Sequence, residues 1–201
     1  MSVIGIEEAT FGVTNRFKAL QFLDDWGLQR VKSGKHGADF VCVDGSKVKV
    51  RDHDNTRLPR SIGARSTVRE VVWGVERASE VRIIADELSK DRTVRHMNDG
   101  SIRTVDDMGL GIGFKVFRPK KLKAAPLLFN MPGDPIRKDQ PAKFYERAIP
   151  QTISHIVFGV PDISTVENFY CGRLGFHVSD RYPGRGVFMR SAERGNHHNL
   201  F

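Results

Sequence analysis

The sequence predicts an α+β fold of repeated βαβββ modules, with two modules in an N-terminal domain and one incomplete domain after a linker. The triplet aromatic-Gly-Val occurs three times, at residues 11–13, 73–75 and 158–160. Each triplet ends a short run with strand-like alternation and precedes a run with helical spacing. Strand-like runs follow the first and third helical runs, which indicates the order β-α-β-β-β.

The three helical runs are expected at residues 15–26, 78–88 and 163–174. Apolar residues recur there every three or four positions, as Phe17, Leu20 and Leu23 do in the first run. The first and third runs end at Gly27 and Gly175, and glycine is the residue best suited to the left-handed position after a helix. Strands are expected at residues 28–31, 40–43, 176–179, 187–190 and 196–201.

Prolines mark the domain boundaries. Six of the nine prolines lie in one stretch: Pro119, Pro126, Pro132, Pro135, Pro141 and Pro150. Proline removes a backbone donor, so residues 119–150 are predicted to form an extended linker. This divides the chain into an N-terminal domain of two modules (1–118), the linker, and the first module of a second domain (151–201). The third module stops in mid-pattern, and we therefore expect the sequence to be a piece of a longer protein.

Composition excludes several classes of protein. The chain has 201 residues and a formal net charge of +8, but acidic and basic residues are interleaved, so we expect no nucleic-acid partner. No apolar run is long enough to cross a bilayer, and the acidic N-terminus does not resemble a secretory signal. Cys42 and Cys171 lie far apart and form no metal-binding or disulfide pattern. A cytoplasmic protein without a membrane partner is expected.

Histidines are the best candidates for chemistry. In the run Ile153–Phe158, period two places His155, Val157 and Gly159 on one face of the strand. His197 and His198 follow near the C-terminus, and adjacent strand residues face opposite ways, so only one of them can share the face of His155. A lone histidine is more often structural than a ligand, but a second imidazole in the same concavity favours a functional site.

The third module also resembles a known family. His155-Ile-Val-Phe-Gly-Val-Pro161-Asp162, followed by Phe169-Tyr170 and Leu174-Gly175-Phe176, resembles the vicinal oxygen chelate (glyoxalase/bleomycin resistance/dioxygenase) superfamily. More narrowly, it resembles the start of the catalytic domain of type I extradiol ring-cleaving dioxygenases. The strong match covers residues 150–201, and the tail 193–200 is similar to the strand that carries that family's acid–base histidine. Residues 1–118 match only in the rhythm of the modules.

The resemblance implies a vicinal oxygen chelate fold and a 2-His-1-carboxylate centre holding Fe(II), with Mn(II) as second choice and no organic cofactor. His155 matches the first metal ligand, whereas the second histidine and the glutamate have no counterpart in the sequence. His198 is preferred as the acid–base residue and His197 stays open, because strand register cannot be derived from sequence. Val157 and Phe188 are expected as substrate-binding pocket walls.

The function implied is extradiol (meta) cleavage of a catechol-type aromatic by dioxygen. The expected partners are a small aromatic diol, dioxygen and further copies of the chain in a homo-oligomer. Two alternatives remain open: a non-catalytic protein of the same superfamily that binds an aromatic or metal-chelated ligand, and a glyoxalase-type isomerase or lyase.

Overall fold

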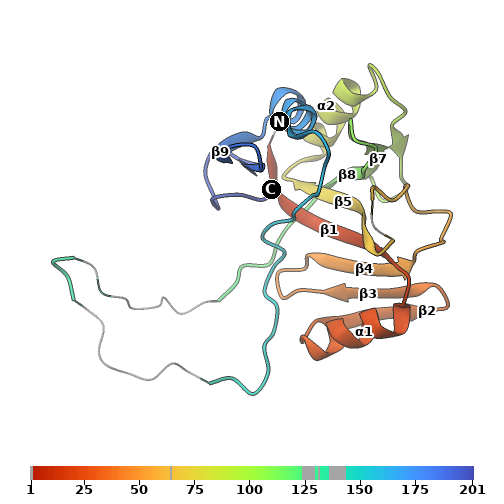
Figure 1. Ribbon diagram of the computed structural model, residues 1–201, viewed down its shortest axis with the longest axis vertical. Helices are drawn as coiled ribbons and strands as arrows, with labels where there is room; N and C mark the ends of the chain where they lie inside the picture. The colour runs from red at the N-terminus through yellow and green to blue at the C-terminus, as the bar shows by residue number, and fades with distance from the viewer. Residues whose placement is uncertain (1, 64, 124–129, 131, 136–143) are drawn as a thin grey trace.

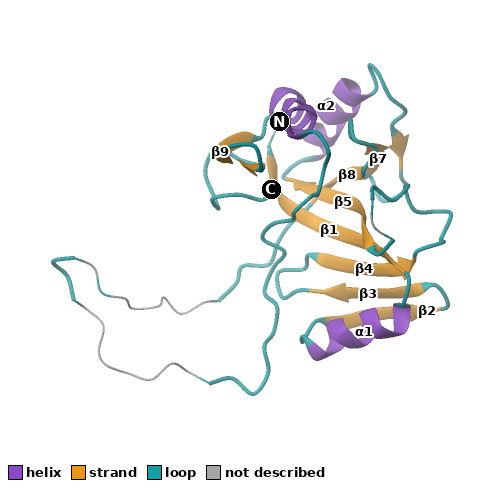
Figure 2. Cartoon of the chain, in the orientation of Figure 1, coloured by secondary structure: helices purple, strands orange, loops and turns teal. Residues whose placement is uncertain are grey.

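The computed structural model describes residues 2–63, 65–123, 130, 132–135 and 144–201. Its strands form one eight-stranded sheet and one two-stranded sheet, with helices packed on them (Figure 2). The elements are β1 (Val3–Val13), α1 (Arg16–Asp25), β2 (Gln29–Gly34), β3 (Gly37–Val41), β4 (Lys47–Asp52), β5 (Thr67–Val75), α2 (Ala78–Leu88), β6 (Arg95–His96), β7 (Ile102–Val105), β8 (Gly111–Val116), α3 (Ile163–Glu167), the π-helix η1 (Asn168–Arg173), β9 (His177–Tyr182) and β10 (Gly186–Arg190). The predicted α+β class is confirmed.

The large sheet has two matching halves. Its strand order is β2-β3-β4-β1-β5-β8-β7-β6, so that β1 and β5 lie side by side at the centre (Figure 1). They pair antiparallel, whereas β4 is parallel to β1 and β8 is parallel to β5. Each half therefore contains one β-α-β-β-β module, and the halves are related by an approximate twofold axis between β1 and β5.

Local signals place the helices. The Asn15 side chain accepts the backbone N–H of Lys18 and caps α1. The Glu80 carboxylate accepts the backbone N–H groups of Glu76 and Arg77, both at 3.1 Å, at the start of α2. The run expected at residues 163–174 is helical as well, but it divides into α3 and the π-helix η1. None of the described helices is long and apolar enough to span a membrane.

One hydrophobic core joins the second and third modules. The Trp73 ring on β5 is fully buried and meets Tyr170 and Phe176 edge-on, at centroid distances of 6.1 and 5.0 Å. The Tyr170 hydroxyl donates to Asp106 Oδ2 at 3.2 Å. Burial raises the pKa of Tyr170 well above its usual value, so this hydroxyl stays protonated and remains a donor. These contacts hold η1 against β5.

Ion pairs tie η1 to the end of α2. The Arg173 guanidinium contacts Glu87 at 3.2 Å and Asp91 at 2.7 Å. The guanidinium groups of Arg92 and Arg173 lie 4.9 and 5.8 Å from the centroid of the Phe169 ring. The third module is thus packed against the second by apolar, ionic and cation–π contacts, and the blue helical segment lies next to α2 in Figure 1.

The prediction of a continuous C-terminal strand at residues 196–201 is wrong. Residues 191–197 form bends, and Leu200 makes isolated bridges to Ile156 (parallel) and Met189 (antiparallel). The run at 153–158 also contributes only the bridge at Ile156. A regular strand is hydrogen-bonded to a neighbouring strand along its length. Among the described residues, the segment around Ile156 has such a neighbour on one side only, at Leu200. Between 119 and 150 the described residues belong to no helix or strand of the fold, and Pro126 and Pro141 lie outside the described residues.

Candidate functional site

Three histidines and one phenylalanine gather at the edge of the third module. The His198 ring lies 4.8 Å from the His155 ring and 4.9 Å from the Phe188 ring on β10, measured between centroids. The His197 ring lies 5.5 Å from Phe188. We refer to these four side chains as the histidine cluster. The structure thus brings together four of the five site residues expected from the sequence.

Backbone hydrogen bonds hold the two halves of the cluster side by side. The N–H of Ile156 donates to the carbonyl of Asn199 at 3.0 Å, and the N–H of Phe201 donates back to Ile156 at 3.1 Å. The Asn199 side chain accepts the backbone N–H and the hydroxyl of Ser191, both at 3.0 Å, and donates to the carbonyl of Ser154 at 3.0 Å. The tail that carries His197 and His198 is therefore anchored next to His155.

The three imidazoles differ in their surroundings. His155 and His197 are exposed, whereas His198 is half-buried. Burial, and then the positive charges that His155 and His197 would carry, lower the pKa of His198 below its usual value. His198 is therefore neutral at pH 7 and has a nitrogen available to accept a proton. Its Nδ1 lies 3.0 Å from Nδ1 of His197, so a proton could pass between the two rings.

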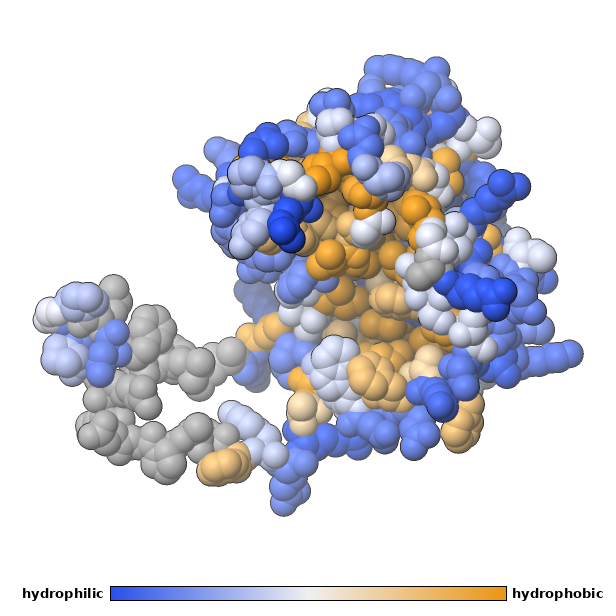
Figure 3. Space-filling model, viewed as in Figure 1, coloured by the Kyte–Doolittle hydropathy of each residue, from blue (hydrophilic) through white to orange (hydrophobic). Residues whose placement is uncertain are grey.

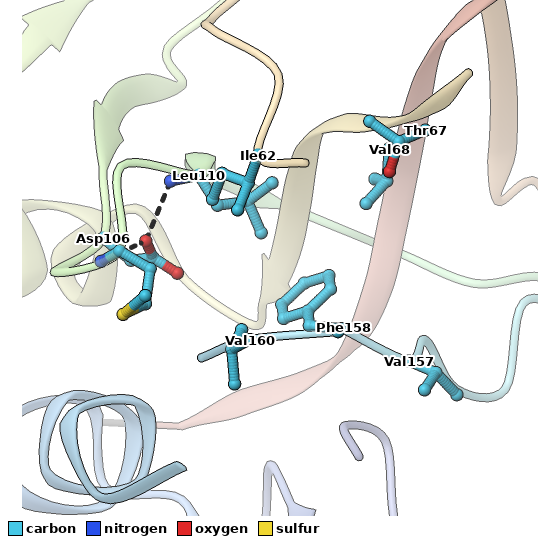
Figure 4. Close-up of a pocket in the computed structure, with 10 residues that line it drawn as sticks. Ile62, Thr67, Val68, Asp106, Leu110, Val157, Phe158 and Val160 are labelled. Atoms are coloured by element: carbon cyan, nitrogen blue, oxygen red, sulfur yellow. Dashed lines mark hydrogen bonds between the residues drawn. The ribbon is translucent and has the colours of Figure 1, made fainter. Parts of the chain in front are cut away.

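Val157 lies apart from the cluster contacts, with 54 % of its surface exposed. It lines a narrow slot between the second and third modules, together with Ile62, Val68, Met108, Leu110 and Phe158 (Figure 4). Asp106 lies at one end of this slot, where its carboxylate accepts the N–H groups of Met108 and Leu110 at 2.9 Å. Apolar side chains also gather in a hollow in the middle of the face shown in Figure 3.

The donors present do not form a complete metal centre. No group of three His, Cys, Asp or Glu side chains in the described part of the chain is placed to hold a metal ion. The histidine cluster offers exposed imidazole nitrogens, which suit Fe(II), but no carboxylate, the kind of ligand that suits Mn(II). The described residues therefore fit at most part of a ligand set.

Sequence reasoning missed two carboxylates at matching positions. Three residues before the aromatic residue of each aromatic-Gly-Val triplet stands an ionisable residue: Glu8 before the first triplet, Glu70 before the second and His155 before the third. Val48 and Val50 of β4 pack toward α1, so the alternate residues of the sheet face away from the helices. Glu8 and Glu70 lie on this helix-free face. An alignment of the three triplets that included the residues before them would have revealed that Glu8, Glu70 and His155 occupy the same position.

Comparison with protein families decides the identity of the third module. Residues 152–201 match the family model of the Glyoxalase/Bleomycin resistance protein/Dioxygenase superfamily. This segment belongs to that superfamily. The sequence comparison with curated proteins found no match.

Solved structures with the same fold cover the whole chain. The Mn(II)-bound glyoxalase from Novosphingobium aromaticivorans has a TM-score of 0.69 and 19% identity, and the similarity covers 99% of this chain and 61% of that one. The halotolerant catechol dioxygenase BphC has a TM-score of 0.67 and 17% identity, and the similarity covers 99% of this chain and 64% of that one. The 2,3-dioxygenase LapB from a Pseudomonas species has a TM-score of 0.68 and 17% identity, and the similarity covers 100% of this chain and 69% of that one.

The TM-scores show that the chain has the vicinal oxygen chelate fold, and at identities below 25% the similarity shows the fold alone. It spans less than two thirds of the length of the first two structures. Both a glyoxalase and catechol dioxygenases share the fold, so the activity does not follow from it.

Proposed function

We propose that the protein takes part in Fe(II)-dependent extradiol cleavage of a catechol-type aromatic, with His155 as one metal ligand. The observation that carries the proposal is the histidine cluster, in which the exposed imidazole of His155 and the ring of Phe188 each lie within 5 Å of the half-buried, neutral imidazole of His198, measured between ring centroids. The remaining metal ligands come from outside this cluster. Catechol dioxygenases among the structures of the same fold support this choice of chemistry.

Each member of the cluster has a distinct task in this proposal. Neutral His198 accepts the proton of a catechol hydroxyl, a role for which a pKa near or below neutrality is suited. His197, exposed and 3.0 Å away, exchanges that proton with solvent. Phe188 packs against the aromatic ring of the substrate, whereas Val157 belongs to the neighbouring slot between the second and third modules. In the reaction, a ring bond beside one hydroxylated carbon is cleaved and both atoms of dioxygen enter the product.

Oxygen consumption tests the proposal. Protein loaded anaerobically with Fe(II) is mixed with oxygenated buffer and catechol, and dioxygen uptake is recorded together with the ring-opened product. We expect uptake in equal amounts to product, with loss of activity below detection in His155→Ala. His198→Gln is expected to lower the rate by about 10²- to 10⁴-fold, since a general acid–base residue contributes that much. His197→Gln, which changes an exposed neighbour, is the matched control and should be affected less.

A specific observation supports one competing function. The Mn(II)-bound glyoxalase has a TM-score as high as those of the dioxygenases. An isomerase consumes no dioxygen, so glyoxalase activity without oxygen uptake would replace the dioxygenase proposal. Oxygen uptake that is unchanged by His155→Ala would contradict the role of His155.

A further inference from the structure

The helix-free face of the large sheet contains a second cluster, in addition to the histidine cluster of the third module. We call it the N-terminal cup and define it by Glu8, Lys49, Glu70 and Arg103. Lys49 Nζ lies 2.6 Å from Glu8 Oε2, and Arg103 Nε lies 3.3 Å from Glu70 Oε2. Each carboxylate thus has one cationic partner from its own half of the sheet.

The side chains of Glu8 and Glu70 have little solvent exposure. Only 5 % of the Glu8 side chain and 15 % of the Glu70 side chain are exposed. Burial raises the pKa of Glu70 above its usual value, the charge of Arg103 lowers it, and the charge of Glu8 raises it. A buried and a half-buried carboxylate that repel each other need positive charge beside them, and this is the electrostatic requirement of a cation site.

The approximate twofold axis between β1 and β5 relates the two ion pairs. Lys49 of β4 lies opposite Thr10 of β1, and the matching position on β8 is Gly113, opposite Val72. A Cβ atom at Gly113 would come within 2.7 Å of Arg103 Cδ. The Arg103 side chain therefore occupies the space that a side chain on β8 would fill. The first half of the sheet supplies its cation, Lys49, from β4, whereas the second half supplies Arg103 from β7.

Two further observations describe the surroundings of the N-terminal cup. A cavity of about 430 Å³ opens onto it, lined by Lys49, Arg103 and residues 96–99 and 101. The neighbouring Glu7 side chain is 5 % exposed, and its Oε2 has no hydrogen-bond partner among the described residues. Glu7 pairs through its other oxygen with Lys47 at 2.9 Å, on the same face of β4 as Lys49.

We propose that the N-terminal cup is a cation site whose cation is the chain's own Lys49 ammonium group. Lys49 takes the place of a divalent ion between Glu8 and Glu70, with Arg103 completing the charge balance. In the third module, the parallel bridge of Ile156 with Leu200 matches the pairing of Ala9 with Val48, so Phe201 stands where Lys49 stands in the first. At this position the third module has an aromatic ring in place of the ammonium group.

Replacing the ammonium with a neutral side chain of similar length tests this assignment. All variants carry His155→Ala, so that the third module contributes no binding. The Lys49→Met variant should be less stable than its parent without metal, and Mn(II) should raise its melting temperature, since a ligand that binds only the folded state stabilises it. The parent, with the ammonium in place, should require at least about tenfold more Mn(II) for the same shift.

Two controls keep the test decisive. The double variant Glu8→Gln/Lys49→Met has neither charge, should fold, and should not respond to Mn(II); Lys32→Met, an exposed lysine on β2, should behave as the parent. If Lys49→Met does not fold alone, refolding with MnCl₂ is compared with refolding in NaCl of equal ionic strength, and rescue by Mn(II) alone is expected. Equal Mn(II) responses of parent and Lys49→Met, or no response of Lys49→Met in either assay, would overturn the assignment.

Discussion

The N-terminal cup and the histidine cluster use the same backbone position in opposite ways. In the cup, Glu8 is buried and Glu70 is half-buried, and the two carboxylates pair with Lys49 and Arg103. In the third module, His155 is exposed, and its ring neighbour is another imidazole. A buried carboxylate pair requires a permanent cation, whereas neutral imidazoles do not. The comparison shows how a repeated fold can keep one site structural and leave its counterpart free for chemistry.

Trp73 joins the second module to the third, and its removal should have the largest effect on stability. Trp73→Ala is expected to cost about 3–5 kcal/mol, because it opens a cavity between β5 and the rings of Tyr170 and Phe176. Denaturant unfolding measures the loss. Phe40→Ala, in the separate core beneath α1, should cost a similar amount but leave the amide hydrogen exchange of α3 and η1 unchanged. Equal exchange in both variants would show that Trp73 does not hold the third module.

Removing Arg103 should unbalance the N-terminal cup. Arg103→Met leaves the Glu70 carboxylate without its guanidinium, and the expected loss is about 2–4 kcal/mol at pH 7. The pKa of Glu70 is already raised in the folded protein and rises further in this variant. A raised acid pKa makes stability fall as pH rises from the unfolded value through the folded one. The deficit should therefore be small below the usual glutamate pKa and complete at neutral pH; a deficit independent of pH would exclude this cause.

The smallest expected effect is a change in the titration of His198. Burial is the larger cause of its lowered pKa, and the charges of His155 and His197 follow. In His155→Ala one charge is lost, so the pKa of His198 should rise toward, but not reach, the usual value. Because the folded pKa is lowered, the stability linked to His198 is present above the unfolded value and is lost as pH falls through the folded one. Proton NMR of the imidazole resonances measures the shift, with His36→Ala as an exposed control.

The repeated elements of the fold could be predicted from sequence because their signals are local. The aromatic-Gly-Val triplets and the apolar spacing located α2 at the residues where it occurs, and Asn15 marked the start of α1. The division of the third helix into α3 and η1 carried no recognisable signal. The C-terminal strand was wrong, because pairing depends on neighbours distant in sequence.

The site could be predicted only in part. One of His197 and His198 was expected beside His155, and the rings of His155 and His198 lie 4.8 Å apart. The relative placement of His197 and His198 could not be derived, since alternation applies to regular strands and residues 191–197 bend. Val157 and Phe188 were both expected as substrate-binding pocket walls; Phe188 lies in the histidine cluster, and Val157 lines the slot next to the second module. The ion pairs of the N-terminal cup join residues from four strands, so they are visible only when the sheet is assembled.

Pulsed electron paramagnetic resonance of bound Mn(II) tests the role of His155 most directly, because it detects whether a histidine nitrogen is coordinated to the ion. We predict nitrogen coupling in the unmodified protein, its loss in His155→Ala, and its retention when Glu8 and Lys49 are replaced together by Gln and Met. Nitrogen coupling that persists without His155, or Mn(II) bound through oxygen ligands alone in the unmodified protein, would contradict the assignment of His155 as a metal ligand.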